Sequence, residues 1–357
     1  MNHTSNSIVA QDVERILRQD LPWSDLNGST VLISGASGFL PAYLIETLAG
    51  LNDRGASIRI VGLVRNLEKA HARLGHLAHS GAEWMLQDIA QTLRADLPQA
   101  DFIIHAASQA SPKYYGIDPV GTLTANTMGT LYLLQHAIKS NAKRFLFFSS
   151  GEIYGIPLNP ERQITESDYG IIDPTNVRSC YAESKRMGET MCVAWAHQYG
   201  LHTGIVRPFH TYGPGVALDD GRVFADFVAD IVNHRSIVLK SDGLAKRPFC
   251  YIADATIGFL SVLLKGAKAE AYNVGNPHAE ISMRDLAATL INLFPERNLK
   301  THFTAPITSN KYLKSPVSRL SPSIAKIEQL GWSPTTSIED GFRRTVLSYE
   351  QLNDKQP

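Results

Sequence analysis

Cysteine is scarce in this sequence, whose 357 residues contain only three: Cys180, Cys192 and Cys250. They form no Cys-x-x-Cys pair and no cluster of the kind that binds a metal ion. A few dispersed cysteines exclude a disulfide scaffold and argue against a cysteine-based zinc site. We therefore expect a protein with neither disulfides nor a bound metal.

Neither sign of charge is in excess, and long apolar runs are missing. Lysine and arginine number 34, as do aspartate and glutamate, whereas binding to nucleic acids or anionic membranes needs a cationic field. No run of about 18 apolar residues is present to span a membrane. Residues 1–17 are polar and have no apolar signal core. We expect a cytoplasmic protein with neither nucleic-acid nor membrane partners.

Strand-like and helical segments alternate along the chain, of which 44% is hydrophobic and 19% charged. Such a composition can bury a sizeable core. Alternation of this kind is typical of a parallel sheet covered by helices on both faces. We expect an α/β fold: a doubly wound parallel sheet (Rossmann) with a smaller C-terminal α/β substrate domain. The strand-like runs are 30–34, 57–64, 83–86, 102–105, 144–148 and 203–206, and the helical ones 42–51, 67–77, 122–140 and 182–199.

The sequence divides into an N-terminal appendage and two domains. The appendage, residues 1–27, includes a short amphipathic helix at 11–19. The alternation of strands and helices weakens after Gly213, where we expect the substrate domain to take over. The dinucleotide-binding domain is assigned to 28–208, with segments around 243–267 returning to it, and the substrate domain to 209–242 and 268–357.

A glycine-containing turn joins the first strand to the first helix of this alternation. Gly35, Ser37 and Gly38 follow the strand, and Phe39 and Leu40 lead into the helix. Glycine lets the backbone approach a pyrophosphate, and the helix N-terminus offers it free N–H groups and a positive dipole end. The position of the turn after the first strand predicts a dinucleotide site at these residues.

The residues after the second strand bear on which dinucleotide is bound. An acidic residue there usually binds the adenosine ribose of NAD, but the stretch 62–66 has none and contains Arg65. Arg65 is either a ligand of the 2′-phosphate of NADP or a solvated arginine at a strand end. Asp88, which precedes Ile89, either accepts a hydrogen bond from the adenine amino group or caps a helix.

Tyr181 and Lys185 form a candidate catalytic pair. They are four residues apart in a segment of helical spacing, so they share one face. A lysine ammonium near a phenol lowers the pKa of the phenol toward neutrality, which would make Tyr181 a general base for a sugar hydroxyl. Ser150, which follows the strand 144–148, can hydrogen-bond the same hydroxyl. The alternative is a surface tyrosine–lysine pair without a chemical role.

Several stretches of the chain resemble the extended short-chain dehydrogenase/reductase family that acts on nucleotide sugars. The resemblance runs from about Gly28 to Tyr349 and is strongest to the UDP-glucuronate decarboxylases. It implies NAD as the tightly held cofactor, with NADP open because of Arg65, and a homodimer through a four-helix interface of 122–140 and 182–199. The stretches are SGASGF at 34–39, HAAS at 105–108, NTMGT at 126–130, SSGEIYG at 149–155, YAESK at 181–185 and RPFHTYGPG at 207–215.

The resemblance also implies roles for individual residues. Ser150, Tyr181 and Lys185 match the catalytic triad, and Glu152 matches an additional acid or base. Further residues matched to the cofactor site are Ile89, Ala106, Ala107, Ser108, Asn126, Ser149 and Pro208, besides Tyr181 and Lys185. Candidates for binding the nucleotide diphosphate and sugar are Lys113, His210, Arg222, Arg247 and Arg319, since guanidinium suits paired phosphate oxygens.

Three departures from the family pattern lie in the substrate pocket or at the cofactor ribose. Gly151 stands where the decarboxylases have serine and the hexose 4,6-dehydratases have an aspartate as general acid. His210 replaces the usual asparagine, and GLVR at 62–65 resembles NADP-using relatives. None of the three touches the oxidising triad. Oxidation at sugar C4 is therefore expected, whereas the step that follows stays open.

Two classes of function remain. The first is an enzyme that oxidises C4 of a nucleotide-linked sugar to a ketone, from which decarboxylation, epimerisation and dehydration are branches of one mechanism. A lyase like UDP-glucuronate decarboxylase is favoured, and a 4-epimerase or 4,6-dehydratase for surface polysaccharide precursors is the alternative. The second class is a non-catalytic dinucleotide-binding module, against which the presence of Ser150, Glu152, Tyr181 and Lys185 argues.

Overall fold

The centre of the molecule is a seven-stranded parallel sheet, seen in a computed structural model that describes residues 6–304 and 317–353. The strand order is β11-β6-β5-β4-β1-β2-β3, so the direction of winding reverses between β1 and β4. This confirms the doubly wound parallel sheet. The strands are β1 (Thr30–Ser34), β2 (Arg59–Val64), β3 (Ala82–Leu86), β4 (Phe102–His105), β5 (Arg144–Phe148), β6 (Thr203–Pro208) and β11 (Glu270–Val274).

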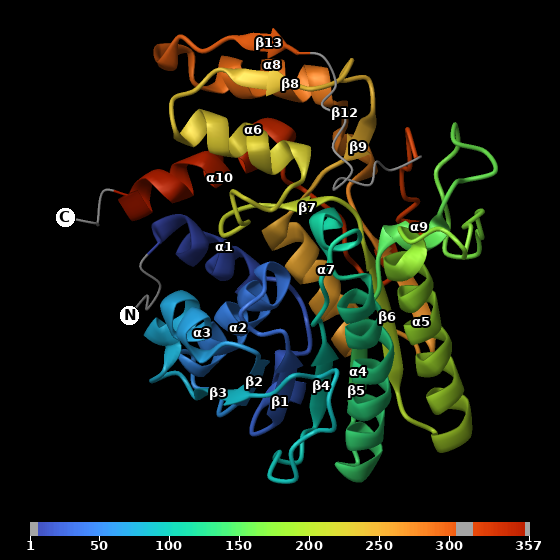
Figure 1. The fold of residues 1–357 in the computed structure, drawn as a ribbon. Helices are drawn as coiled ribbons and strands as arrows, with labels where there is room; N and C mark the ends of the chain where they lie inside the picture. The colour runs from blue at the N-terminus through green and yellow to red at the C-terminus, as the bar shows by residue number, and fades with distance from the viewer. Residues whose placement is uncertain (1–5, 305–316, 354–357) are drawn as a thin grey trace.

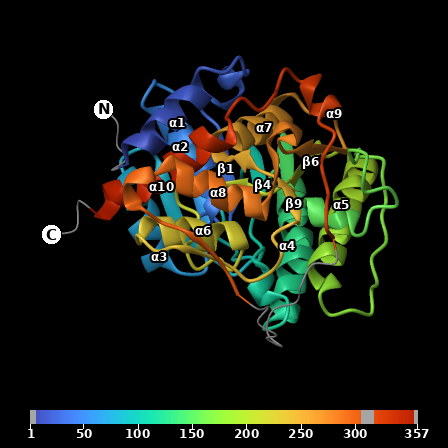
Figure 2. The same cartoon turned by 90° about the horizontal axis from the view of Figure 1, so that it is seen from above.

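Helices cover both faces of this sheet, as Figures 1 and 2 show. Alternate residues of one strand face opposite sides: Val31 and Ile33 of β1 join the larger core cluster, whereas Leu32 joins the second one. The larger cluster includes α2 (Phe39–Asn52), α3 (Leu67–Leu74) and α7 (Ile252–Lys265). The second includes α4 (Pro119–Lys139) and α5 (Ser179–Tyr199), which lie side by side along the outside of the sheet.

The predicted boundaries hold best in the buried strands. The predictions 30–34, 102–105 and 144–148 coincide with β1, β4 and β5, whereas β2 begins two residues later than predicted and β6 runs on to Pro208. The helical segment 67–77 ends as an α-helix at Leu74 and continues as the 3-10 helix η2 (Gly75–Leu77). The other three helices each begin three residues earlier than predicted, because helix starts depend on capping contacts that periodicity does not show.

A smaller α/β unit lies above the carboxyl edge of the sheet (Figure 1). Three of its helices, α6, α8 and α10, pack against one another. The chain returns to the main sheet further than expected, because β11 follows α7 and adds a seventh strand inside the range 268–357. The remaining elements are β7 (Thr211–Tyr212), α6 (Val223–Val232), β8 (Ile237–Leu239), β9 (Lys246–Pro248), β10 (Cys250–Tyr251), β12 (Glu280–Ser282), α8 (Met283–Leu293), β13 (Thr301–Phe303), α9 (Ala325–Glu328) and α10 (Ile338–Asn353).

The N-terminal helix α1 (Ser7–Leu17) is part of the core, although residues 1–27 were expected to form an appendage. Its apolar face, which includes Val13 and Ile16, is buried in the larger cluster. The helix packs against α2, α7 and α10, and Arg15 forms an ion pair with the buried Asp254 of α7. The described part of this segment therefore packs against the C-terminal helix α10, so elements from the two ends of the sequence lie together (Figure 1).

Within residues 6–304 and 317–353, no helix has both the length and the apolar character needed to cross a bilayer. In the same part of the chain, His, Cys, Asp and Glu side chains nowhere gather in threes suited to a metal ion.

Candidate active site

A cavity of about 1990 Å³ lies at the carboxyl ends of the parallel strands. Its walls come from the turn after β1, the ends of β2, β5 and β6, the first turns of α5, and loops of the smaller unit. Open α/β sheets bind ligands at this edge, where the winding reverses, because the loops diverge and leave a crevice. The cavity thus lies where the fold itself predicts a ligand site.

The glycine turn after β1 forms one wall and packs closely against the segment after β4, which leaves no room for a side chain at Gly35. Gly35 has a positive φ of 70°, and a Cβ added there would lie 2.7 Å from Cα of Ala107. Gly38 is the N-cap of α2 and offers no side chain to its first N–H groups. The buried Ser108 Oγ finds no hydrogen-bond partner among the described residues. A close backbone approach, an uncapped helix end and an unsatisfied hydroxyl fit a bound dinucleotide.

The part of the cavity wall at the end of β2 carries positively charged side chains. Arg65, at the end of β2, lines the cavity, and so do Lys69 and Arg73 of α3. The last two were missed, although residues spaced by four on a helix lie on one face. Asp88 also lines the cavity, and its Oδ1 accepts a hydrogen bond from the backbone N–H of Ala90 at 3.0 Å. The residues that follow Asp88 form a turn and not a helix, so the predicted helix cap is wrong, whereas the position at the cavity agrees with the other alternative.

Lys185 and Tyr181 occupy the first two turns of α5 and face the cavity. The Lys185 side chain is almost fully buried, and its Nζ donates a hydrogen bond to the carbonyl oxygen of Phe148 at 2.6 Å. Burial lowers the pKa of Lys185 to about 7 because it disfavours the ammonium. Its Nζ lies 5.8 Å from the centroid of the Tyr181 ring.

The pKa of Tyr181 departs from the expected direction. Burial raises it to about 12, because a phenolate is poorly solvated there. The negative charge of Glu152 acts in the same direction, whereas a hydrogen bond with Ser150 and the positive charge of Arg222 lower the pKa. The prediction that Lys185 brings this phenol toward neutrality is therefore wrong for the protein without ligand, because loss of hydration is the largest influence on the pKa and the cation that lowers it is Arg222.

Glu152 is held by an arginine that the sequence analysis missed. In the 3-10 helix η4 (Gly151–Tyr154) its Oε2 accepts from Nη1 of Arg178 at 3.0 Å, and Oε1 lies 3.5 Å from Nη2. The guanidinium of Arg178 also lies 5.8 Å from the centroid of the Tyr115 ring. Tyr115 in turn stacks on Tyr181, with centroids 5.0 Å apart. Because Arg178 precedes Tyr181 by three residues, helical spacing was the available signal.

The candidate substrate residues are only partly brought together. Lys113, His210, Arg222 and Arg247 line the cavity, whereas Arg319 is not among its lining residues. Arg319 instead forms a bidentate ion pair with Glu280, with both N–O distances 2.8 Å.

The three basic side chains among these residues, Lys113, Arg222 and Arg247, have protein partners of their own. Arg222 pairs with Asp220, and Nζ of Lys113 donates to the carbonyl oxygen of Asp219 at 2.8 Å. Arg247 donates to the carbonyl oxygen of Ser318 at 2.8 Å. His210 has an unusual positive φ of 24°, and burial lowers its pKa well below the ordinary value.

Asn126 and Ser149 contact the residues that support the site. Asn126 is buried on α4 and does not line the cavity; its Nδ2 donates to Ser184 Oγ at 3.0 Å. Ser149 lines the cavity and donates to Glu189, which also forms a bidentate ion pair with Arg207. The other predicted cofactor and catalytic residues line the cavity: Gly35, Ser37, Gly38, Phe39, Leu40, Ile89, Ala106, Ala107, Ser108, Ser150, Glu152, Tyr181, Lys185 and Pro208.

A doubly wound sheet, a glycine turn and a tyrosine–lysine pair at its carboxyl edge define the class: a Rossmann-type dinucleotide-binding protein with a site for oxidation and reduction. Residues 31–275 match the model of the NAD dependent epimerase/dehydratase family. The chain belongs to this family.

Known proteins similar to this chain include sugar-nucleotide enzymes. UDP-glucuronic acid decarboxylase 6 of Arabidopsis thaliana is 33% identical over 319 residues, covering 87% of this chain and 86% of the relative. UDP-glucuronic acid decarboxylase 1 of Xenopus tropicalis is 30% identical and covers 97% of this chain and 79% of the relative.

Two solved structures illustrate the likeness in fold. A double mutant of the dTDP-glucose 4,6-dehydratase of Streptomyces venezuelae, solved with NAD, has a TM-score of 0.75 and 25% identity, and the match covers 90% of this chain and 96% of that chain. The UDP-glucuronic acid 4-epimerase of Bacillus cereus, in complex with UDP-glucuronic acid and NAD, has a TM-score of 0.76 and 22% identity. That match covers 90% of this chain and 99% of the epimerase, and it shows the shared fold.

Proposed function

We propose that this protein oxidises C4 of a nucleotide-linked sugar with NAD and then decarboxylates a hexuronate, as UDP-glucuronate decarboxylases do. One observation carries the proposal: Ser150, Glu152, Tyr181 and Lys185 line the same cavity as the glycine turn. The decarboxylase relatives, similar over most of both chains, support the choice of a uronate substrate.

The first step needs a proton acceptor at the C4 hydroxyl. Tyr181 is the proposed base and Ser150 the hydrogen-bonding partner that orients the hydroxyl. NAD, when bound, supplies the hydride acceptor and a positive charge that favours the phenolate. Residues that would hold it are Gly35, Gly38 and Ser108 at the phosphates and ribose. The buried Lys185, close to the Tyr181 ring, adds positive charge on its protonated form.

The second step follows from the chemistry of the C4 ketone. A C5 carboxylate next to a ketone is lost readily as carbon dioxide, because the electron pair of the breaking bond is delocalised into the carbonyl group. A proton then adds at C5, and hydride returned to C4 regenerates the hydroxyl. Glu152 is the proposed group for positioning the sugar or a water during this step. The product is a nucleotide-linked pentose, a precursor of the kind that polysaccharide synthesis consumes.

Gly151 argues against the dehydratase branch. A Cβ added there would lie 3.0 Å from the Phe209 ring, so a side chain at this position has little room and glycine delivers no acid to a leaving hydroxyl at C6. C4 epimerisation remains the second candidate. It needs no group at position 151, because the keto-sugar only rotates in the site and then accepts the hydride on the opposite face of C4.

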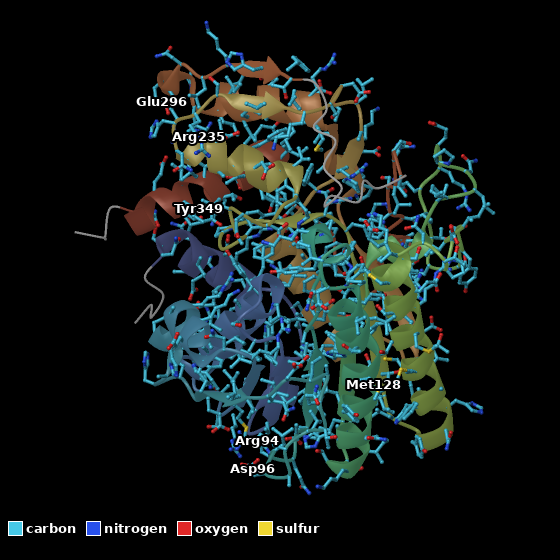
Figure 3. The ribbon with its side chains drawn as sticks, in the orientation of Figure 1. Arg94, Asp96, Met128, Arg235, Glu296 and Tyr349 are labelled. Carbon is cyan, nitrogen blue, oxygen red and sulfur yellow. The ribbon has the colours of Figure 1, made fainter. Side chains whose placement is uncertain are left out.

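The outer faces of α4 and α5 support a proposed homodimer through four helices. Val120, Leu123, Met128, Met187 and Val193 are apolar and exposed on these two helices, which run side by side (Figure 1). Figure 3 marks Met128 on α4. Burying this surface against a second copy would remove it from water. Val120→Lys combined with Val193→Lys is expected to convert the dimer to monomers, which light scattering detects as a halved molar mass. A variant with the molar mass of the wild-type dimer would contradict this interface.

A panel of nucleotide sugars tests the function. The purified protein is incubated with NAD and with UDP-, dTDP-, GDP- and CDP-linked hexoses and with UDP-glucuronate, and products are identified by mass and NMR. The proposal expects carbon dioxide and a UDP-pentose from UDP-glucuronate. A product of unchanged mass and inverted C4 would identify an epimerase, and loss of water a dehydratase. No product from any member of the panel would reject the enzyme in favour of a non-catalytic dinucleotide-binding module.

A further inference from the structure

Arg178 connects two groups that act at different steps of the proposed reaction. Its guanidinium forms an ion pair with the Glu152 carboxylate, with Nη1–Oε2 3.0 Å. It also lies over the ring of Tyr115, which stacks on Tyr181 with ring planes inclined by 17°. Arg178 is the N-cap residue of α5, so its backbone is held by the same helix that carries Tyr181.

Glu152 without its partner would oppose the base. Its negative charge disfavours the Tyr181 phenolate, which raises the pKa of Tyr181. The arginine side chain is 15% exposed and the glutamate 33%, so water and salt screen this pair less than they would a pair on the open surface. A cation held on Glu152 offsets the repulsion and gives the carboxylate a fixed orientation.

We propose that Arg178 is a positioning residue that acts through Glu152: it compensates the carboxylate charge beside Tyr181 and directs the carboxylate toward the cavity. The proposal rests on the proposed function for its chemical meaning, because the base and the second-step carboxylate are assigned there. It adds a requirement that the triad alone lacks: C4 oxidation depends on a residue that need not touch the substrate.

Other groups also lie around Tyr181, and three of them, Ser150, Glu152 and Arg222, shift its pKa. Ser150 and Glu152 approach from η4, Arg222 from the N-cap of α6, Lys185 from α5 and Tyr115 from the loop after β4. Arg178 differs from Arg222 and Lys185 because its ion pair is with Glu152. Its influence on Tyr181 should therefore depend on the charge of Glu152, and this dependence separates it from the others.

The test compares Arg178→Met in two backgrounds, the native Glu152 and Glu152→Gln, with the protein loaded with NAD. The pH dependence of cofactor reduction is measured in a single turnover with the accepted nucleotide sugar. Phenolate absorbance, taken as the difference from the matching Tyr181→Phe protein, titrates Tyr181 without substrate. Arg59→Met is the control, because Arg59 pairs with Glu83 at the far end of β2, at 2.8 Å.

We expect Arg178→Met to move the midpoint of both profiles up by about one pH unit, since a neighbouring charge shifts a pKa by about 1–3 units. Below the midpoint the rate of cofactor reduction then falls about tenfold. In the Glu152→Gln background less than half of this shift should remain. Arg178→Lys keeps the charge, so its midpoints should return at least halfway to the wild-type values. Arg59→Met should leave both profiles unchanged.

An unshifted midpoint in Arg178→Met, or an equal shift in both backgrounds, would overturn the proposal; the latter would mean that Arg178 acts directly on Tyr181 or on substrate. If Arg178→Met does not fold, Arg178→Gln removes the same charge and keeps a hydrogen-bond donor. Failure of the proposed function gives a different pattern: no member of the panel reduces the cofactor, while the phenolate titration still reports on Arg178.

Discussion

Nζ of Lys185 donates a hydrogen bond to the carbonyl oxygen of Phe148, with Nζ and O 2.6 Å apart. Phe148 is the last residue of β5, and Ser149 and Ser150 follow it directly. The lysine thereby joins α5 to the end of the strand that carries the serine of the site. The hydrogen bond holds Nζ 5.8 Å from the centroid of the Tyr181 ring, where burial disfavours the protonated form of the lysine.

Lys185 should make the stability of the ligand-free protein depend on pH. Its pKa is about 7 in the folded protein and ordinarily about 10.5, so between these values the unfolded chain binds the extra proton. The contribution of Lys185 is therefore most favourable above pH 10.5 and is progressively lost as the pH falls through 7. Denaturant unfolding between pH 7 and 9.5 should show the free energy of unfolding of wild type rising with pH relative to that of Lys185→Met. A difference between the two proteins that does not change with pH would contradict a neutral buried lysine.

Tyr181→Phe should abolish sugar oxidation and leave NAD bound. The substitution removes only the hydroxyl that accepts the proton, and removal of a general base costs about 10²–10⁴-fold in rate. Cofactor reduction on addition of substrate measures the loss, and NAD retention on a desalting column serves as the control. Near-normal reduction would exclude Tyr181 as the base.

Glu152→Gln should separate the two chemical steps. The variant keeps the shape of the side chain and removes its charge, while Ser150, Tyr181 and Lys185 remain in place. We expect it to reduce the bound cofactor with substrate and then stall with a keto-sugar, visible as lasting absorbance of reduced nicotinamide. Complete turnover at the normal rate would remove Glu152 from the chemistry and would favour a simple 4-epimerase.

Arg65→Glu examines the preference between NAD and NADP. If Arg65 binds the 2′-phosphate, NADP affinity should fall by about one to two orders of magnitude, since a charge-assisted contact contributes about 1.5–3 kcal/mol. NAD affinity should change little. Titration calorimetry with both dinucleotides gives the ratio, and an unchanged ratio would make Arg65 a solvated arginine. Lys69→Glu on the same wall tells whether α3 contributes to this preference.

Local features of the chain were predictable from the sequence, because short-range pattern determines them. The strands β1, β4 and β5 are apolar runs of strand length. The glycine turn lies between a strand and a helix, and its position depends only on the local sequence. The spacing of Tyr181 and Lys185 likewise follows from one helix. Ser150, by contrast, meets them because parallel strands end at one edge, which is a property of the predicted fold class.

Contacts between distant segments were not predictable. The sequence around Arg319 gives no sign of its partner, and only the folded structure shows its ion pair with Glu280. The pairing of Glu152 with Arg178 joins η4 to α5 across 26 residues. The direction of the Tyr181 pKa shift differs from the prediction for the same reason: a neighbouring charge can be inferred from the sequence, whereas the loss of hydration on burial depends on the fold.

Transfer of hydride from C4 and back to C4 is the central claim, and a single measurement follows it. UDP-glucuronate carrying deuterium at C4 is given to the NAD-loaded enzyme in one turnover, and the product is examined by NMR and mass. The account predicts transient reduced nicotinamide, release of carbon dioxide, and a UDP-pentose that retains the deuterium at C4. A carbon dioxide–releasing turnover with no reduced cofactor, or a product whose C4 deuterium is lost to solvent, would contradict it.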